Sequence, residues 1–208
     1  EAGGQGLLAG INAAMHFRGC DPLVLQRNEA YMGVLIDDLV TKETLEPYRM
    51  FTARAEYRLL LRHTNADLRL SRVGYNIGLL KSSSLNIVKK KLVFLDKEIK
   101  RLQKSRPSLE SVNYFLSSLG EKPTLEKLSL AEILRRPAVG LKNFIEKGVL
   151  FFDLEVFSKE QQDDLLDELE TSIKYEGYIK RQDSLIRRLE QNESARIPPL
   201  FNFNECRA

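Results

Sequence analysis

The chain has 208 residues, of which 43% are hydrophobic and 29% are charged, and its formal net charge is +3 at pH 7. This length and apolar content suffice for one or two domains with a sizeable core, and the charge content fits a soluble protein. No stretch approaches the ~20 uninterrupted apolar residues of a membrane span, and the first residues resemble neither a signal peptide nor a transit peptide. A cytoplasmic location without membrane contact is therefore expected.

Cysteine and histidine form no recognisable site in the sequence. Cys20 and Cys206 lie outside any Cys-x-x-Cys or Cys/His cluster, so neither a disulfide framework nor a zinc site is predicted. His16 and His63 are also isolated, and a histidine that acts as a general base needs an orienting partner. We therefore assign no catalytic residue and no metal ligand to this chain.

The first residues, EAGGQGLLAGINAAM, combine a glycine-rich face with an apolar face. The glycines leave one side bare, so a flat or phosphorylated ligand, or a neighbouring helix, can approach the backbone closely. Apolar residues recur at helical spacing, at Leu7, Leu8, Ile11 and Ala14. The segment is either a tightly packed core helix or the end of a cofactor-binding domain whose beginning is missing. The second interpretation makes the chain a fragment.

Arginine is concentrated between residues 48 and 72, where six arginines face only two acids, Glu56 and Asp67. The arginines are Arg49, Arg54, Arg58, Arg62, Arg69 and Arg72. Their planar guanidinium groups make bidentate contacts to phosphate and stack on bases, whereas lysine offers a point charge. The block is the strongest local positive field in the sequence and indicates a nucleic-acid contact.

The spacing of the arginine block predicts a basic strip. Arg54, Arg58 and Arg62 would share one face of a helix, and in an extended segment Arg58 and Arg62 would still lie on one side. The alternatives are a solvated face or internal ion pairing with acids elsewhere in the sequence, namely Asp37, Asp38 and Glu56.

Residues 88–102 predict an amphipathic helix. Its apolar positions form a seam suited to packing along another helix, and they are Val88, Leu92, Leu95, Ile99 and Leu102. The basic residues around this seam are Lys89, Lys90, Lys91, Lys97, Lys100, Arg101 and Lys104. They indicate either a second RNA-facing surface or a solubilising face.

Serines mark the starts of three further helices. Ser108 can cap a short helix that stops at Gly120, and Ser129 and Ser158 begin capping-box patterns. The pattern after Ser158 predicts the longest helix of the chain, over residues 159–192. Its apolar stripe would pack on the seam of residues 88–102 as a long antiparallel pair.

The predicted long helix has acidic residues toward its start and basic residues, including Lys180 and Arg181, toward its end. Each such end charge stabilises a helix by roughly 0.3–1 kcal/mol. Gly177, between Tyr175 and Tyr178, costs about 1 kcal/mol relative to alanine. A glycine there indicates close approach of a neighbouring helix or of RNA.

Three segments carry a resemblance to a known family. They are the run YMGVLIDDLVTKETLEPYRMFTARAEYRLLLRHTNADLRL at residues 31–70, the preceding EAGGQGLLAGINAA, and IKYEGYIKRQ at residues 173–182. Together they closely resemble the C-terminal half of the tRNA uridine 5-carboxymethylaminomethyl modification enzymes, the MnmG/GidA family. The resemblance and a composition shift near residue 81 predict a mainly α chain. Residues 1–80 would end an FAD-binding α/β domain with a basic helical segment, and residues 81–208 would form a C-terminally truncated helical domain.

The resemblance also implies a function. Family members bind FAD, use a reduced nicotinamide, NADH, and act with the GTPase MnmE on the wobble uridine of certain tRNAs, and a homodimer is expected. Gln5 and Gly6 match the family segment beside the flavin. The six arginines, with Lys180 and Arg181, would face tRNA, and the helical domain would meet MnmE.

The chain also departs from the family pattern. It has no Gly-x-Gly-x-x-Gly after a strand and no cysteine in a matching motif, so the resemblance implies that the fragment alone is catalytically inactive. The alternatives are a relative of the folate- and FAD-dependent tRNA methyltransferase, or a structural helical adaptor without RNA contact.

Overall fold

The computed structural model describes residues 1–42 and 47–193, which form helices joined by irregular segments and contain no strand. The helices are α1 (Ala2–Phe17), α2 (Tyr31–Thr41), α3 (Ala66–Asn76), α4 (Ser82–Lys104), α5 (Leu109–Ser118), α6 (Leu130–Leu134), α7 (Leu141–Glu146), α8 (Lys159–Lys174) and α9 (Glu176–Glu193), with a 3-10 turn η1 at Thr52–Arg54. None of the described helices is long and apolar enough to cross a membrane. The helices named above make the fold of the described residues mainly α, as the sequence predicts.

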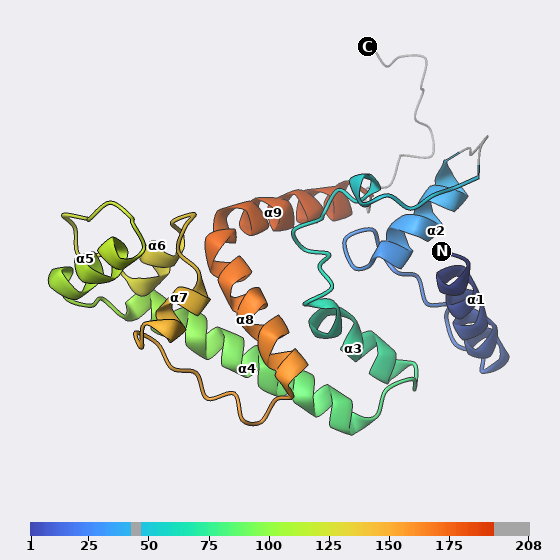
Figure 1. Ribbon diagram of the computed structural model, residues 1–208. Coiled ribbons are helices and arrows are strands. Elements are labelled where there is room, and N and C mark those ends of the chain that lie inside the picture. Colours follow the sequence, from blue (N-terminus) through green and yellow to red (C-terminus); the bar gives the residue numbers. More distant parts are fainter. Residues whose placement is uncertain (43–46, 194–208) are drawn as a thin grey trace, which may run out of the picture.

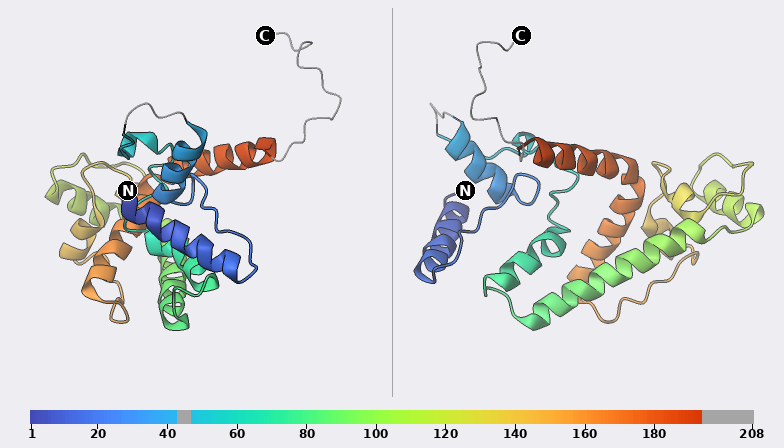
Figure 2. Two further views of the ribbon diagram at one scale, coloured as in Figure 1. Left: turned by 90° about the vertical axis from the view of Figure 1, so that its right-hand side faces the viewer. Right: turned by 180° about the vertical axis from the view of Figure 1, so that it is seen from behind.

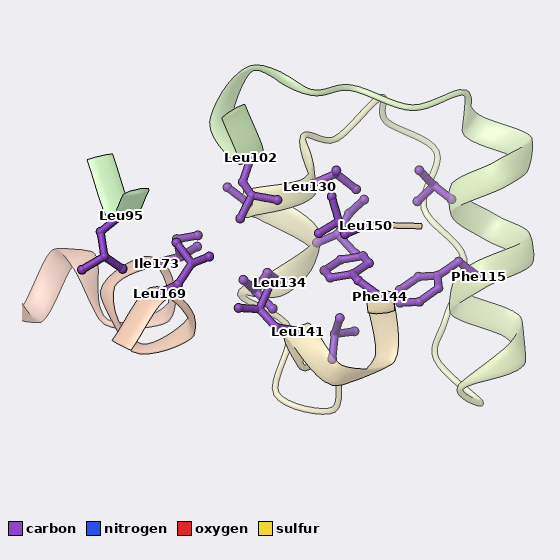
Figure 3. Packing of buried hydrophobic residues seen from close by; sticks show 14 of the residues in the cluster. Leu95, Leu102, Phe115, Leu130, Leu134, Leu141, Phe144, Leu150, Leu169 and Ile173 are labelled. Carbon is purple, nitrogen blue, oxygen red and sulfur yellow. The ribbon is translucent and has the colours of Figure 1, made fainter. Parts of the chain in front are cut away.

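Helix α4 runs diagonally beneath the C-terminal half of the described chain, and α6 and α8 pack against it (Figure 1). The core lies between these helices, α5 and α7, where large apolar side chains interdigitate (Figure 3). Phe144 of α7 stacks on Phe115 of α5 with ring centroids 4.7 Å apart. This one continuous core packs helices α4 to α8 into a single unit.

The predicted helix starts are confirmed. The Ser108 hydroxyl accepts a hydrogen bond from the Ser111 amide, and Ser129 and Ser158 each form a complete capping box. Gly120 and Gly148 follow α5 and α7 with φ values of +72° and +68°, a backbone conformation that glycine adopts without steric cost. The local sequence thus sets these helix ends.

The predicted seam on α4 needs a correction. Its buried residues are Val88, Lys91, Leu95, Glu98 and Leu102, whereas Leu92 is 48% exposed. Lys91 is buried because α3 packs on this part of α4 and presents Asp67, whose carboxylate accepts a hydrogen bond from Lys91 Nζ at 2.7 Å. Burial of a charged group is tolerated when it is paired in this way.

The single helix predicted over residues 159–192 is wrong. Tyr175 separates α8 from α9, and the chain turns sharply there (Figure 1). Arg135, which follows α6, donates from Nε to the Ile173 carbonyl at 3.3 Å and from Nη2 to the Glu176 carboxylate, so it caps the end of α8 and holds the start of α9. Gly177 lies within the first turn of α9 and does not make the break.

The bend changes the predicted helix pair. Helix α8 contacts α4 and crosses it obliquely, while α9 leaves toward the N-terminal part of the chain (Figures 1 and 2). The second half of the predicted apolar stripe, Ile179, Ile186 and Leu189, therefore lies outside the main core: Ile179 and Ile186 are half-buried and Leu189 is 50% exposed. A long antiparallel pair is not seen among the described residues.

Helices α1 and α2 lie apart from the main core (Figure 2). Val34 of α2 packs with Ala55 and Leu61 in a small separate cluster, and α1 buries only Leu8. Helix α3 joins this part to the rest by packing on α4. Residues 1–42 and 47–80 contribute no strand, so their assignment to an FAD-binding domain stays a prediction.

Candidate nucleic-acid interface

The arginine-rich segment is mostly irregular, so the predicted helical strip is wrong. Between residues 47 and 65 only η1 is helical, and side chains take the carbonyl oxygens that a helix would use. Arg62 donates to the Leu59 carbonyl, and Asn65 donates to the Leu60 carbonyl at 3.1 Å. Because side-chain donors satisfy these carbonyls, the segment does not need a helix to pair them.

Two of the six arginines point into the protein. Arg62 pairs with Glu168 of α8, and their side chains are only 17% and 10% exposed. Arg69 donates to the Glu29 carbonyl, to the Arg62 carbonyl at 3.0 Å and to the Asn65 side chain at 3.0 Å. Burial, and then the nearby Arg62 charge, lower the pKa of Arg69. Both residues join the arginine-rich segment to neighbouring elements, and their assignment as tRNA contacts stays a prediction that this geometry disfavours.

The other four arginines face solvent to different degrees. Arg54 lies over the Tyr48 ring, with its guanidinium carbon 4.8 Å from the centroid, and stands 3.8 Å from Asp38. Arg49, Arg58 and Arg72 are exposed and form no ion pair with any residue in the two described ranges. These three guanidinium groups are therefore the ones free to meet an anionic partner.

The internal ion pairing considered for the arginine block exists for Arg54, which pairs with Asp38 at 3.8 Å, but Arg27 makes most of the contacts to the three acids. Its guanidinium contacts Asp37 at 2.7 Å, Asp38 at 2.6 Å and Glu56 at 2.6 Å. The sequence analysis missed Arg27, because a lone arginine in a loop has no spacing signal and its partners come from α2 and from residue 56. Lys42 also contacts Asp38, so these acids are engaged by cations other than Arg49, Arg58 and Arg72.

Asp38 is the centre of this network. Its side chain is fully buried, and it accepts hydrogen bonds from Arg27 and from the Tyr48 hydroxyl at 2.9 Å, with Lys42 Nζ at 2.7 Å. Burial alone raises the pKa of Asp38, but the bonds from Lys42, Arg27 and Tyr48 outweigh it and hold the pKa at about 2. The carboxylate is therefore ionised throughout the physiological range.

The lowered pKa of Asp38 predicts acid sensitivity. A depressed carboxyl pKa contributes stability that is present above the unfolded value and lost as pH falls from about 4 to about 2, here about 2 kcal/mol. We expect Asp38→Asn to lose this part of the pH dependence when the free energy of unfolding is measured by urea denaturation across that range. Asp96→Asn is the control, because Asp96 and its partner Lys100 are 64% and 63% exposed. Equal pH profiles for wild type and Asp38→Asn would contradict the prediction.

A cleft of about 1000 Å³ lies between the arginine-rich segment and helices α7 and α8. Arg58 and His63 line it on one side, and Lys142 and Lys174 line it on the other. Acidic side chains, Asp163, Asp167 and Glu170, also line this cleft, and Glu170 pairs with Lys174 at 2.9 Å. The cleft brings Arg58 together with two lysines that the sequence analysis did not select.

The predicted pair Lys180 and Arg181 lies at the corner between α8 and α9. Lys180 is 71% exposed and pairs with Glu176 at 2.6 Å. The hydrogen bond from Lys180 lowers the pKa of the Glu176 carboxyl and outweighs burial, which acts in the opposite direction. The Arg181 guanidinium carbon lies 5.9 Å from the centroid of the Tyr178 ring. Both cations face solvent beside an exposed aromatic side chain.

Gln5 and Gly6 lie on exposed positions of α1, and Glu1, one turn before Gln5, accepts a hydrogen bond from the Met50 amide at 2.6 Å. No described atom lies within 4 Å of where a Cβ would sit on Gly3, Gly6 or Gly10, which share one face of the helix. The bare glycine face predicted from the sequence is therefore open. No group of three or more His, Cys, Asp or Glu within residues 1–42 and 47–193 is placed to hold a metal ion.

Known proteins match nearly the whole chain. Residues 83–183 match the family described as "tRNA modifying enzyme MnmG/GidA C-terminal helical domain". The enzyme named "tRNA uridine 5-carboxymethylaminomethyl modification enzyme MnmG" from Thermodesulfovibrio yellowstonii is 48% identical over 206 residues, and that from Caldicellulosiruptor saccharolyticus is 45% identical over 207 residues. This chain belongs to the MnmG/GidA family.

The fold agrees with this family. The structure of Aquifex aeolicus GidA in its form II crystal superposes with a TM-score of 0.75 at 34% identity, over 97% of this chain and 30% of the other. The chain likewise spans about a third of the length of the MnmG relatives it matches, 32% for both bacteria named above. It corresponds to the C-terminal part of a MnmG/GidA protein.

Proposed function

We propose that this chain is the C-terminal part of a flavin-dependent enzyme that modifies the wobble uridine of tRNA, and that its own task is to bind tRNA. The observation that carries the proposal is the set of guanidinium groups at Arg49, Arg58 and Arg72, which are exposed and form no ion pair with any residue of the described ranges. Asp37, Asp38 and Glu56 are paired with Arg27 instead. Exposed arginines that lack acidic partners are suited to phosphate.

Lys180 and Arg181 extend this surface along α9. The cleft beside Arg58 also reaches Tyr175, whose ring lies 6.5 Å from the Tyr178 ring that Arg181 approaches. The cleft therefore ends beside the corner that carries Lys180 and Arg181. Arg54 contributes less, because Tyr48 and Asp38 already engage its guanidinium.

The complete enzyme, on this proposal, binds FAD, uses NADH, acts with the GTPase MnmE and forms a homodimer. The open face of α1 fits a flat cofactor, because the backbone at Gly6 has no described atom within 4 Å of a Cβ position. Gln5 would contact one side of FAD there through its side-chain amide, Gly6 would let the flat ring approach the helix backbone, and FAD when bound supplies the redox chemistry. The 208 residues alone are expected to be catalytically inactive and to bind FAD negligibly.

The tRNA proposal predicts a defined salt dependence. The binding constant falls as salt rises, and each phosphate that a cation of the protein contacts adds roughly 0.7–0.9 to the slope of log K against log salt. We expect Arg58→Gln and Arg72→Gln each to reduce that slope by about this amount, in fluorescence anisotropy titrations of labelled tRNA at several salt concentrations. Lys127→Gln is the matched control, because Lys127 is an exposed cation in the loop before α6, at the far end of the molecule (Figure 1).

The outcomes separate the alternatives. If the arginine variants and the control keep the wild-type slope, the phosphate contacts lie elsewhere. If wild type shows no salt-dependent tRNA binding, the chain is a structural adaptor without RNA contact.

A further inference from the structure

Two exposed tyrosines stand together where α8 meets α9. Tyr175 is 43% exposed and Tyr178 is 61% exposed, and their ring centroids are 6.5 Å apart with planes inclined by 56°. Neither ring belongs to the apolar core. Large aromatic side chains that stay exposed on a helix corner do not stabilise the fold by burial, so their presence points to a partner.

An arginine completes this aromatic corner. The Arg181 guanidinium carbon lies 5.9 Å from the Tyr178 centroid, and Arg181 forms no ion pair within the described part of the chain. A guanidinium plane and a phenol ring side by side offer two flat, polarisable surfaces. A nucleobase can stack on either of them.

The backbone at the corner is open to close approach. Gly177 lies between the two tyrosines, and no described atom lies within 4 Å of where its Cβ would sit. A glycine within a helix lowers helix stability by about a fivefold factor relative to alanine, and no close neighbour of Gly177 explains its presence here. Its bare backbone leaves room for a flat group against the start of α9.

The corner is also held in one conformation before any partner binds. Arg135 bonds both the Ile173 carbonyl and the Glu176 carboxylate, and Glu176 in turn binds Lys180 at 2.6 Å. These contacts come from α6, α8 and α9. A preorganised site loses less freedom on binding than a mobile one.

Cations lie next to the aromatic corner. Tyr175 lines the cleft of about 1000 Å³ together with Arg58, Lys142 and Lys174. The acidic side chains Asp163, Asp167 and Glu170 also line it, and Glu170 already pairs with Lys174 at 2.9 Å and accepts a hydrogen bond from the Leu141 amide. Arg58 and Lys142 form no ion pair within the described part of the chain, so they are the cations of the cleft that are left to meet phosphate.

We infer that Tyr178 and Arg181 form a stacking platform for an unpaired base of RNA, with the adjoining phosphates directed toward Arg58 and Lys142. The inference rests on the proposed tRNA-binding function and names the feature that this corner recognises, namely a single-stranded nucleotide rather than a base-paired stem. Paired bases are stacked on each other and present no free face to an aromatic ring.

The test compares single-stranded and double-stranded RNA. The full-length protein that contains this chain is titrated into fluorescein-labelled oligouridine and into a blunt RNA duplex of the same length. We expect Tyr178→Ala to weaken binding of oligouridine by about 10- to 100-fold and to leave duplex binding and the salt slope unchanged. Tyr178→Phe keeps the ring and is expected to bind as wild type does. Arg181→Lys keeps the charge but loses the flat guanidinium, so it is expected to weaken oligouridine binding at an unchanged salt slope.

Tyr114→Ala is the matched control, because Tyr114 is an 82% exposed tyrosine on α5, away from the corner. It is expected to change neither affinity. Thermal melting checks that Tyr178→Ala is folded, as the exposure of the side chain predicts. Wild-type oligouridine affinity in Tyr178→Ala with a normal salt slope overturns the platform and leaves the proposed function standing. Equal losses in Tyr178→Ala and Tyr178→Phe overturn it too, because the hydroxyl would then be the binding group. Absence of salt-dependent RNA binding in wild type overturns both proposals.

Discussion

Replacing Phe144 by alanine is expected to lower the free energy of unfolding by about 4 kcal/mol. The side chain is fully buried, and its ring stacks on Phe115 at 4.7 Å with the planes inclined by 12° (Figure 3). Alanine would leave a cavity between α5 and α7 that the surrounding helices cannot fill, because each is also fixed by its own caps. The loss therefore combines the transfer free energy of the ring with the cost of the cavity.

Chemical denaturation followed by circular dichroism measures the effect of Phe144→Ala. Phe151→Ala serves as the control, because Phe151 carries the same side chain at 76% exposure, and its replacement is expected to change stability by no more than about 0.5 kcal/mol. Similar losses in the two variants would mean that the ring of Phe144 is not in the core described above.

Replacing Gly33 by alanine is expected to destabilise the N-terminal part by about 3 kcal/mol. A Cβ on Gly33 would lie 2.2 Å from the Gln26 carbonyl oxygen and 2.7 Å from the Leu25 carbonyl oxygen. Both are backbone atoms, so relief requires α2 to move away from residues 25 and 26. That movement would also disturb Arg27, whose contacts to Asp37, Asp38 and Glu56 depend on the same turn.

Gly6→Ala is the matched control for Gly33→Ala. No described atom lies within 4 Å of its Cβ position, so the gain in helix propensity is expected to raise the stability of α1 by up to about 1 kcal/mol. Thermal unfolding followed by circular dichroism compares the two variants. Opposite signs are expected, and a shared sign would contradict the contact assigned to Gly33. In the full-length protein the same Gly6→Ala variant is expected to weaken FAD binding, measured by flavin fluorescence, because its methyl group narrows the proposed approach.

Much of the local structure could be predicted from sequence, because it depends on residues three or four apart. The capping boxes at Ser129 and Ser158 are of this kind, since each pairs a side chain with a backbone amide of the same turn. The left-handed glycines after α5 and α7 are also local. Prediction failed where distant residues compete for the backbone. Arg135, about forty residues away, ends α8 at Tyr175, and nothing in the local pattern of residues 159–192 reveals it.

The candidate site divides in the same way. The sequence located the arginine block and the pair Lys180 and Arg181, because charge density is a property of composition. It did not separate exposed Arg58 from buried Arg62, although both are arginines four residues apart in one segment. Glu168, 106 residues away, decides that difference by pairing with Arg62.

By itself, then, the sequence determined the family, the mainly α character of the chain, the three helix starts at Ser108, Ser129 and Ser158 and the presence of a basic region. Only the tertiary structure decided which arginines remain free, where the longest predicted helix breaks and which side chains line the cleft. The physical reason is the separation in sequence of the residues that determine each feature. Helix caps and charge density depend on neighbouring residues, whereas the neutralisation of a charge depends on whichever residue the fold brings within about 4 Å of it.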